Sequence, residues 1–130
     1  MGESGDMPGK EYYKDMEKSE QAVAQYLNEM GFDWYYEHPV FVYDEKKRPR
    51  VWTPDFYLPA FQVYIEVCGS QDFDYKYRQK IYHDNDIPVV FLHFYKDRKE
   101  WDSWLRKKFL ELEEERHAKV MGYVKKLLLI

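Results

Sequence analysis

The apolar run IPVVFLHFY, residues 87–95, constrains the fold of this chain more than any other feature of the sequence. The run is nearly continuous and contains Pro88 at its start, which is typical of a buried strand at the centre of a sheet. A helical pattern over 74–85 precedes it, and a charged amphipathic helix is predicted over 97–118. The second half of the chain therefore predicts a strand packed among helices.

The first half of the chain adds one helix and three strands. The helical pattern covers 11–30 and ends before Gly31, a residue that suits the position just past a helix. Strands are predicted over 33–43, where Pro39 marks an edge or a bulge, over 51–58 and over 61–68, with a charged turn at 44–50 and a loop at GSQD. The tail 120–130 fits either a helix or a strand. This order predicts an α/β domain built on a mixed sheet, with 1–9 as a disordered tail and 10–130 as a single domain.

Composition narrows the classes of partner. The net charge of −4 means that nucleic-acid binding requires a local basic patch. A single cysteine excludes an internal disulfide framework and fits a reducing compartment. The N-terminus lacks the apolar segment of a signal peptide, and the run LLLI at 127–130 is too short to span a bilayer. We expect an intracellular, cytoplasmic protein without a membrane segment.

Three acids stand where apolar residues are expected. On a helical wheel, Glu20 falls within the apolar stripe of the first helix, where it either faces the core or extends from the edge to water. Asp55 and Glu66 lie within apolar strand patterns. If Leu58 pairs with Phe61 across a two-residue Pro-Ala loop, strand alternation makes these two acids diagonal neighbours on one face.

Two adjacent carboxylates repel each other, and a divalent cation removes the conflict. Hard oxygen ligands suit Mg²⁺, which is usually held by one or two protein carboxylates and keeps several waters. The four histidines show no spacing that would indicate zinc. The alternative is a pair of half-exposed acids that are neutralised by nearby lysines.

Four segments together resemble the PD-(D/E)xK nuclease superfamily: KSEQAVAQYLNEMGFDWYYEHPV, TPDFYLP, YIEVCG and YRQKIYHDNDIPVVFL. The resemblance covers about residues 18–94 and implies a restriction endonuclease-like αβββαβ core, a central mixed sheet flanked by helices, to which a C-terminal helix is added. It implies that Asp55 and Glu66 hold Mg²⁺, for which Mn²⁺ would substitute. Glu20, directly or through water, and the backbone carbonyl of Val67 would complete the site.

The chain departs from that pattern at Cys68, which stands where the superfamily carries its lysine two residues after the second acid. A thiol supplies no fixed positive charge, and Cys68 is most simply a small buried apolar residue. Some relatives carry the lysine on the following helix, and this variant implies Lys80 as the catalytic lysine, with Lys76 in reserve. The alternative is that both lysines are solvated surface residues. Gln71 is a weaker candidate for orienting a phosphate or a water.

Two basic groups are candidates for contact with the phosphates of DNA. They are the turn residues Lys46, Lys47, Arg48 and Arg50 and the helix residues Lys76, Arg78 and Lys80. The simpler interpretation of the turn is a solvated, exposed hairpin.

Three functional hypotheses follow from the sequence. The first is a metal-dependent DNA endonuclease, and the second is a non-catalytic relative that serves as a DNA-binding or protein-interaction module, for which Cys68 is the main argument. The third is a structural subunit of a larger assembly. A homodimer formed through the apolar C-terminal segment is a further expectation.

Overall fold

The computed structural model describes residues 14–69, 74–94 and 99–129, and its contacts divide the chain into two compact units, Met1–Arg98 and Lys99–Ile130. The first unit contains α1 (Lys18–Glu29), β1 (Tyr35–Tyr36), β2 (Val40–Tyr43), β3 (Pro49–Trp52), β4 (Phe56–Leu58), β5 (Val63–Cys68), α2 (Tyr75–Asp84) and β6 (Val89–His93). The second unit contains α3 (Trp101–Leu128). The predicted α/β class and mixed sheet are confirmed.

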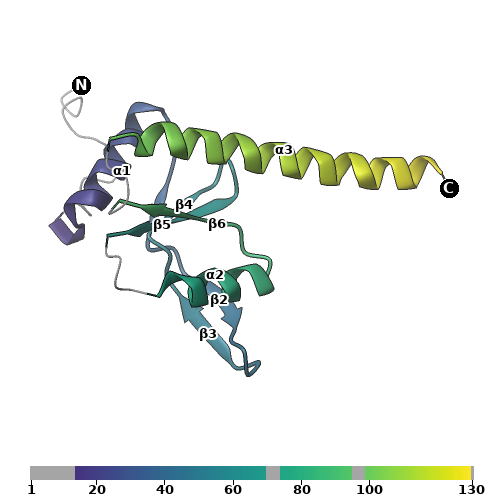
Figure 1. Ribbon diagram of the computed structural model, residues 1–130, viewed down its shortest axis with the longest axis horizontal. Helices are drawn as coiled ribbons and strands as arrows, with labels where there is room; N and C mark the ends of the chain where they lie inside the picture. The colour runs from purple at the N-terminus through teal and green to yellow at the C-terminus, as the bar shows by residue number, and fades with distance from the viewer. Residues whose placement is uncertain (1–13, 70–73, 95–98, 130) are drawn as a thin grey trace. The chain divides into compact units, whose positions relative to one another are not determined.

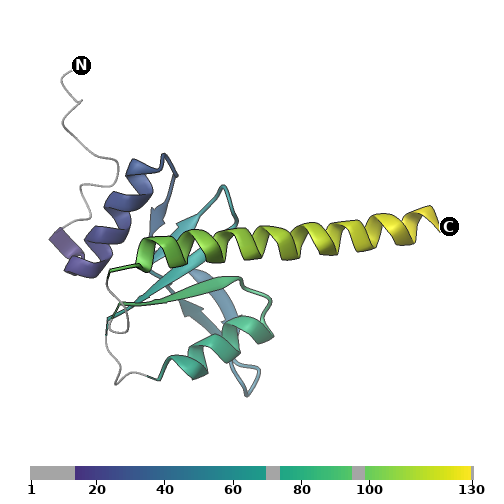
Figure 2. The ribbon, with the colours of Figure 1, turned by 45° about the horizontal axis from the view of Figure 1, so that its top comes forward.

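The first unit is built on two sheets. A four-stranded sheet has the order β1-β4-β5-β6, in which β5 and β6 are parallel and the other pairs are antiparallel, while β2 and β3 form a separate antiparallel pair. In both ribbon views α1 and α2 lie on opposite sides of the larger sheet (Figures 1 and 2). The core between α2, the small sheet and the larger sheet contains the buried residues Val40, Val42, Cys68, Ile81, Tyr82 and Phe91.

Two predicted strands, 33–43 and 51–58, are each split between the two sheets. Glu37, with a φ of 53°, and Pro39 separate β1 from β2, and the buried Pro54 separates β3 from β4. A proline has no N–H for the ladder, and a positive φ breaks the extended backbone, so both segments change direction at these residues. The β2–β3 hairpin therefore lies between two strands that pair with each other.

The predicted helix over 11–30 is too long at its start. The α-helix begins at Lys18, where the Glu20 carboxylate accepts a hydrogen bond from the backbone N–H of Glu17 at 3.1 Å. This contact satisfies an N–H that has no partner inside the helix and fixes the start there. Residues 11–13 lie outside the described part of the chain. Gly31 follows the helix with a φ of 77°, as predicted.

The strand predicted at 87–95 is not central. β6 stands at one end of the order of the four described strands, although Val90, Phe91 and Leu92 are buried. A continuous apolar run indicates that both faces of a strand are buried, but it does not show whether a neighbouring strand pairs with each of its two edges. The ambiguous tail 120–130 is helical as far as Leu128. The predicted tail 1–9 and most of the GSQD loop lie outside the described residues.

The α3 helix is described on its own. Its apolar side chains are spread around the helix, and toward its C-terminal end many are exposed: Val120, Met121, Tyr123, Val124, Leu127, Leu128 and Leu129. No helix in the described ranges combines the length and apolarity needed to cross a membrane.

Candidate functional site

Asp55 directly precedes β4, and continuing the register of β4 and β5 by one residue places it opposite Glu66, where the sequence predicted a diagonal arrangement. Leu58 pairs with Val63, not with Phe61, so the corner between β4 and β5 has four residues instead of two. The reason is Pro59, whose φ is fixed near −65° and cannot adopt the positive φ that two-residue hairpin turns require. Gln62, with a φ of 52°, turns the chain back. The correction shifts the register by two residues, which leaves both acids on the same face.

Backbone N–H groups hold both carboxylates in place. The Asp55 N–H donates to Oε1 of Glu66 at 3.2 Å, and the Val67 N–H donates to Oδ2 of Asp55 at 2.7 Å. Each acid is thus tied to the backbone of the opposite strand, across the end of the β4–β5 ladder. This arrangement fixes the two carboxylates relative to each other more firmly than side-chain packing alone would.

Glu20 joins the two acids from the start of α1. Its Oε1 accepts hydrogen bonds from the Glu17 N–H and from the Tyr36 hydroxyl, both at 3.1 Å. Burial and then the charge of Glu20 raise the pKa of Tyr36 well above its usual range, which keeps this hydroxyl a donor. Glu20 therefore has a structural role at the helix start and also faces the other acids.

The three acids line one cavity of about 460 Å³, open to solvent. Its lining residues are Glu17, Glu20, Thr53, Asp55, Glu66, Val67, Gly69, Tyr75 and Arg78. The structure thus brings together five of the predicted site residues: Glu20, Asp55, Glu66 and Val67, predicted to be catalytic or metal-binding, and Arg78, predicted to contact DNA. It does not bring Lys80 or Lys76 to the cavity lining.

Burial and mutual repulsion dominate the electrostatics of the cavity. Burial, followed by the charge of Glu66 and a hydrogen bond with the Glu20 carboxylate, raises the pKa of Asp55 to about 8, against the lowering effect of the Val67 N–H. Burial also raises the pKa of Glu66, although Arg78 acts in the opposite direction. Without a cation, both acids are therefore harder to ionise than solvent-exposed carboxyl groups.

The positive charge at the cavity comes from Arg78 on α2. Its Nε lies 2.8 Å from Oε2 of Glu66, an ion pair without the alignment of a good hydrogen bond, and its Nη2 donates to the Tyr82 hydroxyl at 3.2 Å. The guanidinium also lies 4.8 Å from the ring centre of Trp52. These contacts hold Arg78 in a fixed orientation beside the acids.

Lys80 lies elsewhere on α2. Its Nζ pairs with Asp84 at 2.8 Å, its side chain is 63% exposed, and the hydrogen bond that it donates to Asp84 raises its pKa. Two residues along a helix correspond to a rotation of about 200°, so Lys80 and Arg78 point in nearly opposite directions. Helical periodicity offered a signal for Arg78, because it follows Tyr75 by three residues and precedes Tyr82 by four, on the side that packs against the core.

Cys68 agrees with its interpretation as a buried apolar residue. It is fully buried in the core and its Sγ lies 3.7 Å from the Glu66 carbonyl oxygen. Burial raises the pKa of the thiol to about 12, so the thiol stays neutral. Gln71 lies outside the described residues.

The metal site remains an expectation from the sequence. Among the residues that the structure describes, no three His, Cys, Asp or Glu side chains form a group that could hold a metal ion. The donor set of Asp55 and Glu66 nevertheless fits Mg²⁺, which needs only one or two carboxylates. Burial and the neighbouring acids raise the pKa of Asp55, and a bound divalent cation would favour its charged form.

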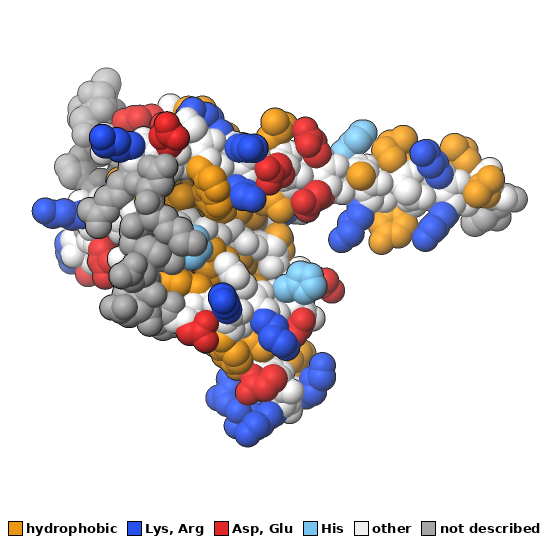
Figure 3. Space-filling model, viewed as in Figure 1, with side chains coloured by type: hydrophobic (Ala, Val, Ile, Leu, Met, Phe, Trp, Pro, Cys, Tyr) orange, Lys and Arg blue, Asp and Glu red, His pale blue; other side chains and the backbone are white. Residues whose placement is uncertain are grey.

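The predicted DNA-contacting residues fall at two places. Lys46, Lys47, Arg48 and Arg50 lie at and beside the β2–β3 turn, where Lys and Arg side chains gather on the surface (Figure 3). Lys76 stands near the start of α2, where its backbone N–H donates to Asp74 at 3.1 Å. Arg78 instead lines the acid cavity.

Comparisons with known proteins identified no relative. A scan against protein-family models, a search of curated proteins and a search of solved structures each returned no match.

Proposed function

We propose that this protein is a metal-dependent DNA endonuclease that hydrolyses phosphodiester bonds at the Asp55–Glu66 cavity. The observation that carries the proposal is the direct opposition of two largely buried acids beside an arginine, in a cavity that solvent reaches. A protein that needed only stability would gain little from this arrangement, because burying adjacent carboxylates is costly unless they are paired or bind a cation.

Asp55 and Glu66 would hold Mg²⁺ or Mn²⁺, with Glu20 beside them. Bound Mg²⁺ supplies a water of lowered pKa and neutralises the charge that develops on the phosphate. The Val67 and Asp55 N–H groups keep the two carboxylates aligned, so that little reorganisation accompanies binding. The hydrogen bonds from Glu17 and Tyr36 orient Glu20 in the same way.

Arg78 takes the role that the resemblance implied for Lys80. A guanidinium stays charged at all working pH values and presents several donors in a fixed plane, which suits contact with phosphate oxygens. Nε faces Glu66 and Nη2 faces Tyr82, whereas no described residue forms a hydrogen bond with Nη1. A phosphate in the cavity would receive its contact from this atom.

A non-catalytic DNA-binding or protein-interaction module is the second candidate. The ion pair between Arg78 and Glu66 favours it, because the guanidinium already neutralises one of the two acids on which cation binding depends. Cys68 in place of the usual lysine points the same way. In that case the cavity would be a remnant of a catalytic site, and no cation would bind.

The two candidates are separated by cleavage of labelled duplex, branched and single-stranded DNA with Mg²⁺, with Mn²⁺ and with EDTA. We expect cleavage only with the metals, and its loss in Asp55→Asn. Arg78→Gln should lower the rate by about 10²-fold or more, the scale seen when one donor to a developing charge is removed. Lys80→Gln is the matched control, since it removes the same charge from the same helix on the opposite side, and its rate should stay close to that of the wild type.

DNA binding in Ca²⁺ should be nearly equal for these variants, which separates loss of chemistry from loss of affinity. Calorimetry with Mn²⁺ provides a second measurement: a site present in the wild type and absent in Asp55→Asn supports the metal assignment. Absence of both cleavage and cation binding in the wild type would reject the endonuclease in favour of the non-catalytic module.

A further inference from the structure

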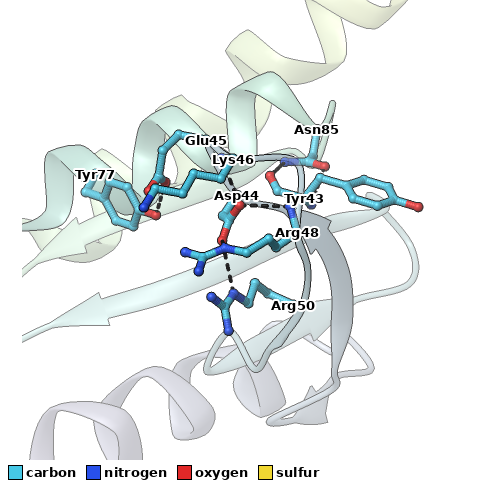
Figure 4. A network of polar contacts seen from close by, with 8 residues as sticks. All are labelled: Tyr43, Asp44, Glu45, Lys46, Arg48, Arg50, Tyr77 and Asn85. Carbon is cyan, nitrogen blue, oxygen red and sulfur yellow. Dashed lines mark hydrogen bonds and ion pairs between the residues drawn. The ribbon is translucent and has the colours of Figure 1, made fainter.

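The β2–β3 hairpin carries a buried acid at the centre of its basic turn. The Asp44 side chain is 4% exposed, whereas the side chains of Arg48 and Arg50 are 52% and 46% exposed. The Nε atoms of both arginines donate to the same oxygen of Asp44, Oδ2, at 2.9 Å and 3.1 Å. Figure 4 shows the two guanidinium groups on one side of the hairpin, away from the Tyr43 ring.

The other oxygen of Asp44 organises the backbone of the turn. Oδ1 accepts hydrogen bonds from the N–H groups of Lys46 and Arg48, both at 2.9 Å. Burial alone would raise the pKa of Asp44, but the N–H of Arg48 and the side chain of Arg50 outweigh it and hold this pKa well below its usual range. Asp44 thus remains charged and bound to four donors.

The hairpin is also fixed to α2. The Asn85 side chain accepts from the Tyr43 N–H at 2.8 Å and donates to the Tyr43 carbonyl at 2.9 Å, and the Tyr77 hydroxyl donates to Glu45 (Figure 4). The contact with Tyr77 also occupies the one exposed acid of the turn. The basic side chains therefore stand on a turn whose first arm is held against α2 at Tyr43 and Glu45.

The two arginines present unused donors. Only Nε of each is engaged in a hydrogen bond, and no described residue contacts the Nη groups of Arg48 or Arg50 through a hydrogen bond or ion pair. Lys46 and Lys47 add two exposed positive charges on the same turn. This concentration of positive charge stands out in a chain whose net charge is −4.

The hairpin connects this basic turn to the acid cavity. Arg50 and Trp52 alternate onto one face of β3, and the Trp52 ring lies beneath the Arg78 guanidinium that contacts Glu66. The next residue, Thr53, lines the cavity. The cross-strand neighbours of Trp52 and Arg50 on this face, Val40 and Val42, are buried, so the face packs against the core and Arg50 is its exposed basic residue at the turn end.

From these contacts we infer that Arg48 and Arg50, held side by side by Asp44, form a clamp for the sugar–phosphate backbone of a nucleic acid. The two planar guanidinium groups are oriented by the Asp44 carboxylate and present donors that suit phosphate oxygens. Because they are already ordered before the ligand binds, binding costs less side-chain entropy. The clamp reads charge and spacing, so it carries no base preference. The inference rests on the proposed function only in that it assumes the same nucleic acid as ligand.

The decisive variant is Asp44→Asn, because a diffuse basic patch and a clamp ordered by Asp44 predict opposite changes in affinity for nucleic acid. If the turn is a diffuse patch, removal of a negative charge tightens binding of a labelled oligonucleotide. If Asp44 sets a clamp, the affinity falls by about fivefold or more, since the two side chains must then be ordered at the moment of binding. Circular dichroism and a melting curve establish that the variant is folded.

The double variant Arg48→Lys with Arg50→Lys tests the clamp at constant charge. It keeps both cations but removes the planar forks, and weaker binding is expected although the net charge is the same. Arg48→Gln and Arg50→Gln should each reduce the magnitude of the slope of log affinity against log salt concentration by about 1. Arg106→Gln on α3 is the control, since the Arg106 side chain is 50% exposed and carries the same charge.

Binding is measured in EDTA by fluorescence anisotropy, so that the clamp can fail while cleavage stands, or the reverse. Inorganic phosphate in excess and vesicles with anionic lipid serve as the other two ligands. Displacement of the oligonucleotide by phosphate at low concentration would show an isolated anion site, and binding to vesicles without binding to oligonucleotides would show a lipid surface. Either result overturns the inference, as does tighter binding by Asp44→Asn.

Discussion

Replacement of Asp55 by Asn should stabilise the cation-free protein at alkaline pH and leave it nearly unchanged at pH 4. The pKa of Asp55 is raised from 3.8 to about 8, chiefly by burial and then by Glu66. Between these two pH values the native state binds a proton that the unfolded chain has released. Stability therefore falls as the pH rises through this window and becomes level above about pH 8.

The size of the effect follows from the shift. One pKa unit corresponds to about 1.4 kcal/mol, so about four units set a ceiling of about 5 to 6 kcal/mol at pH 9. Asparagine is neutral at every pH and its carbonyl can still accept from the Val67 N–H. Its NH₂ group replaces an acceptor oxygen, which costs part of this ceiling. We therefore expect the free energy of unfolding to rise by about 2 to 4 kcal/mol, a large part of the 5 to 15 kcal/mol that stabilises a typical domain.

Urea unfolding in EDTA, followed by tryptophan fluorescence from pH 4 to pH 9, measures this difference. Asp84→Asn is the control, since Lys80 lowers the pKa of Asp84 and its removal should change stability in the opposite direction. Mg²⁺ should restore the wild type at pH 9 through binding to the native state and should leave Asp55→Asn unchanged. Parallel pH curves for wild type and Asp55→Asn would refute the electrostatic account of the cavity.

Two further predictions concern the core and the C-terminal helix. Cys68 should resist a thiol reagent in the native protein and react only when the protein unfolds. Cys68→Ser should lower the free energy of unfolding by about 1 to 3 kcal/mol, because it buries a hydroxyl, and should leave the cleavage rate nearly unchanged. Fast labelling of the native protein or a large loss of cleavage rate would contradict the assignment of Cys68 to the core. The exposed apolar end of α3 should mediate self-association, so light scattering should report a dimer that deletion of 124–130 converts to a monomer, and a wild-type monomer at high concentration would exclude it.

The acid pair could be predicted from the sequence although the register was wrong. The face of a strand depends only on whether a shift is odd or even, and replacing a two-residue corner by a four-residue one is an even change. Asp55 and Glu66 therefore stayed together, and moved from diagonal to opposed positions. The sequence pattern was sufficient to predict that Asp55 and Glu66 share a face, but it did not determine which residues of the two strands lie opposite each other.

The positive charge of the cavity could not be placed in the same way. The resemblance implies Lys80 from its position along the chain, whereas the choice between Lys80 and Arg78 depends on which side of α2 faces the sheet. Strand boundaries failed for a related reason. Strand propensity runs through Pro39 and Pro54, and only the competition between two sheets for these segments decides where each strand ends.

The pairing of β1 with β4 makes the β2–β3 hairpin a modular insertion. The Glu37 N–H donates to the Asp55 carbonyl at 2.9 Å, so the chain leaves the larger sheet and returns to it at one closed point. Residues 38–54 can therefore be exchanged as a cassette without a change in the pairing that holds Asp55. A cassette that keeps Val40, Val42 and Trp52 would preserve the packing of the hairpin against α2, while the sequence of the basic turn could vary. The fold thus separates the frame of the acid cavity from a basic turn whose length and charge can be altered independently.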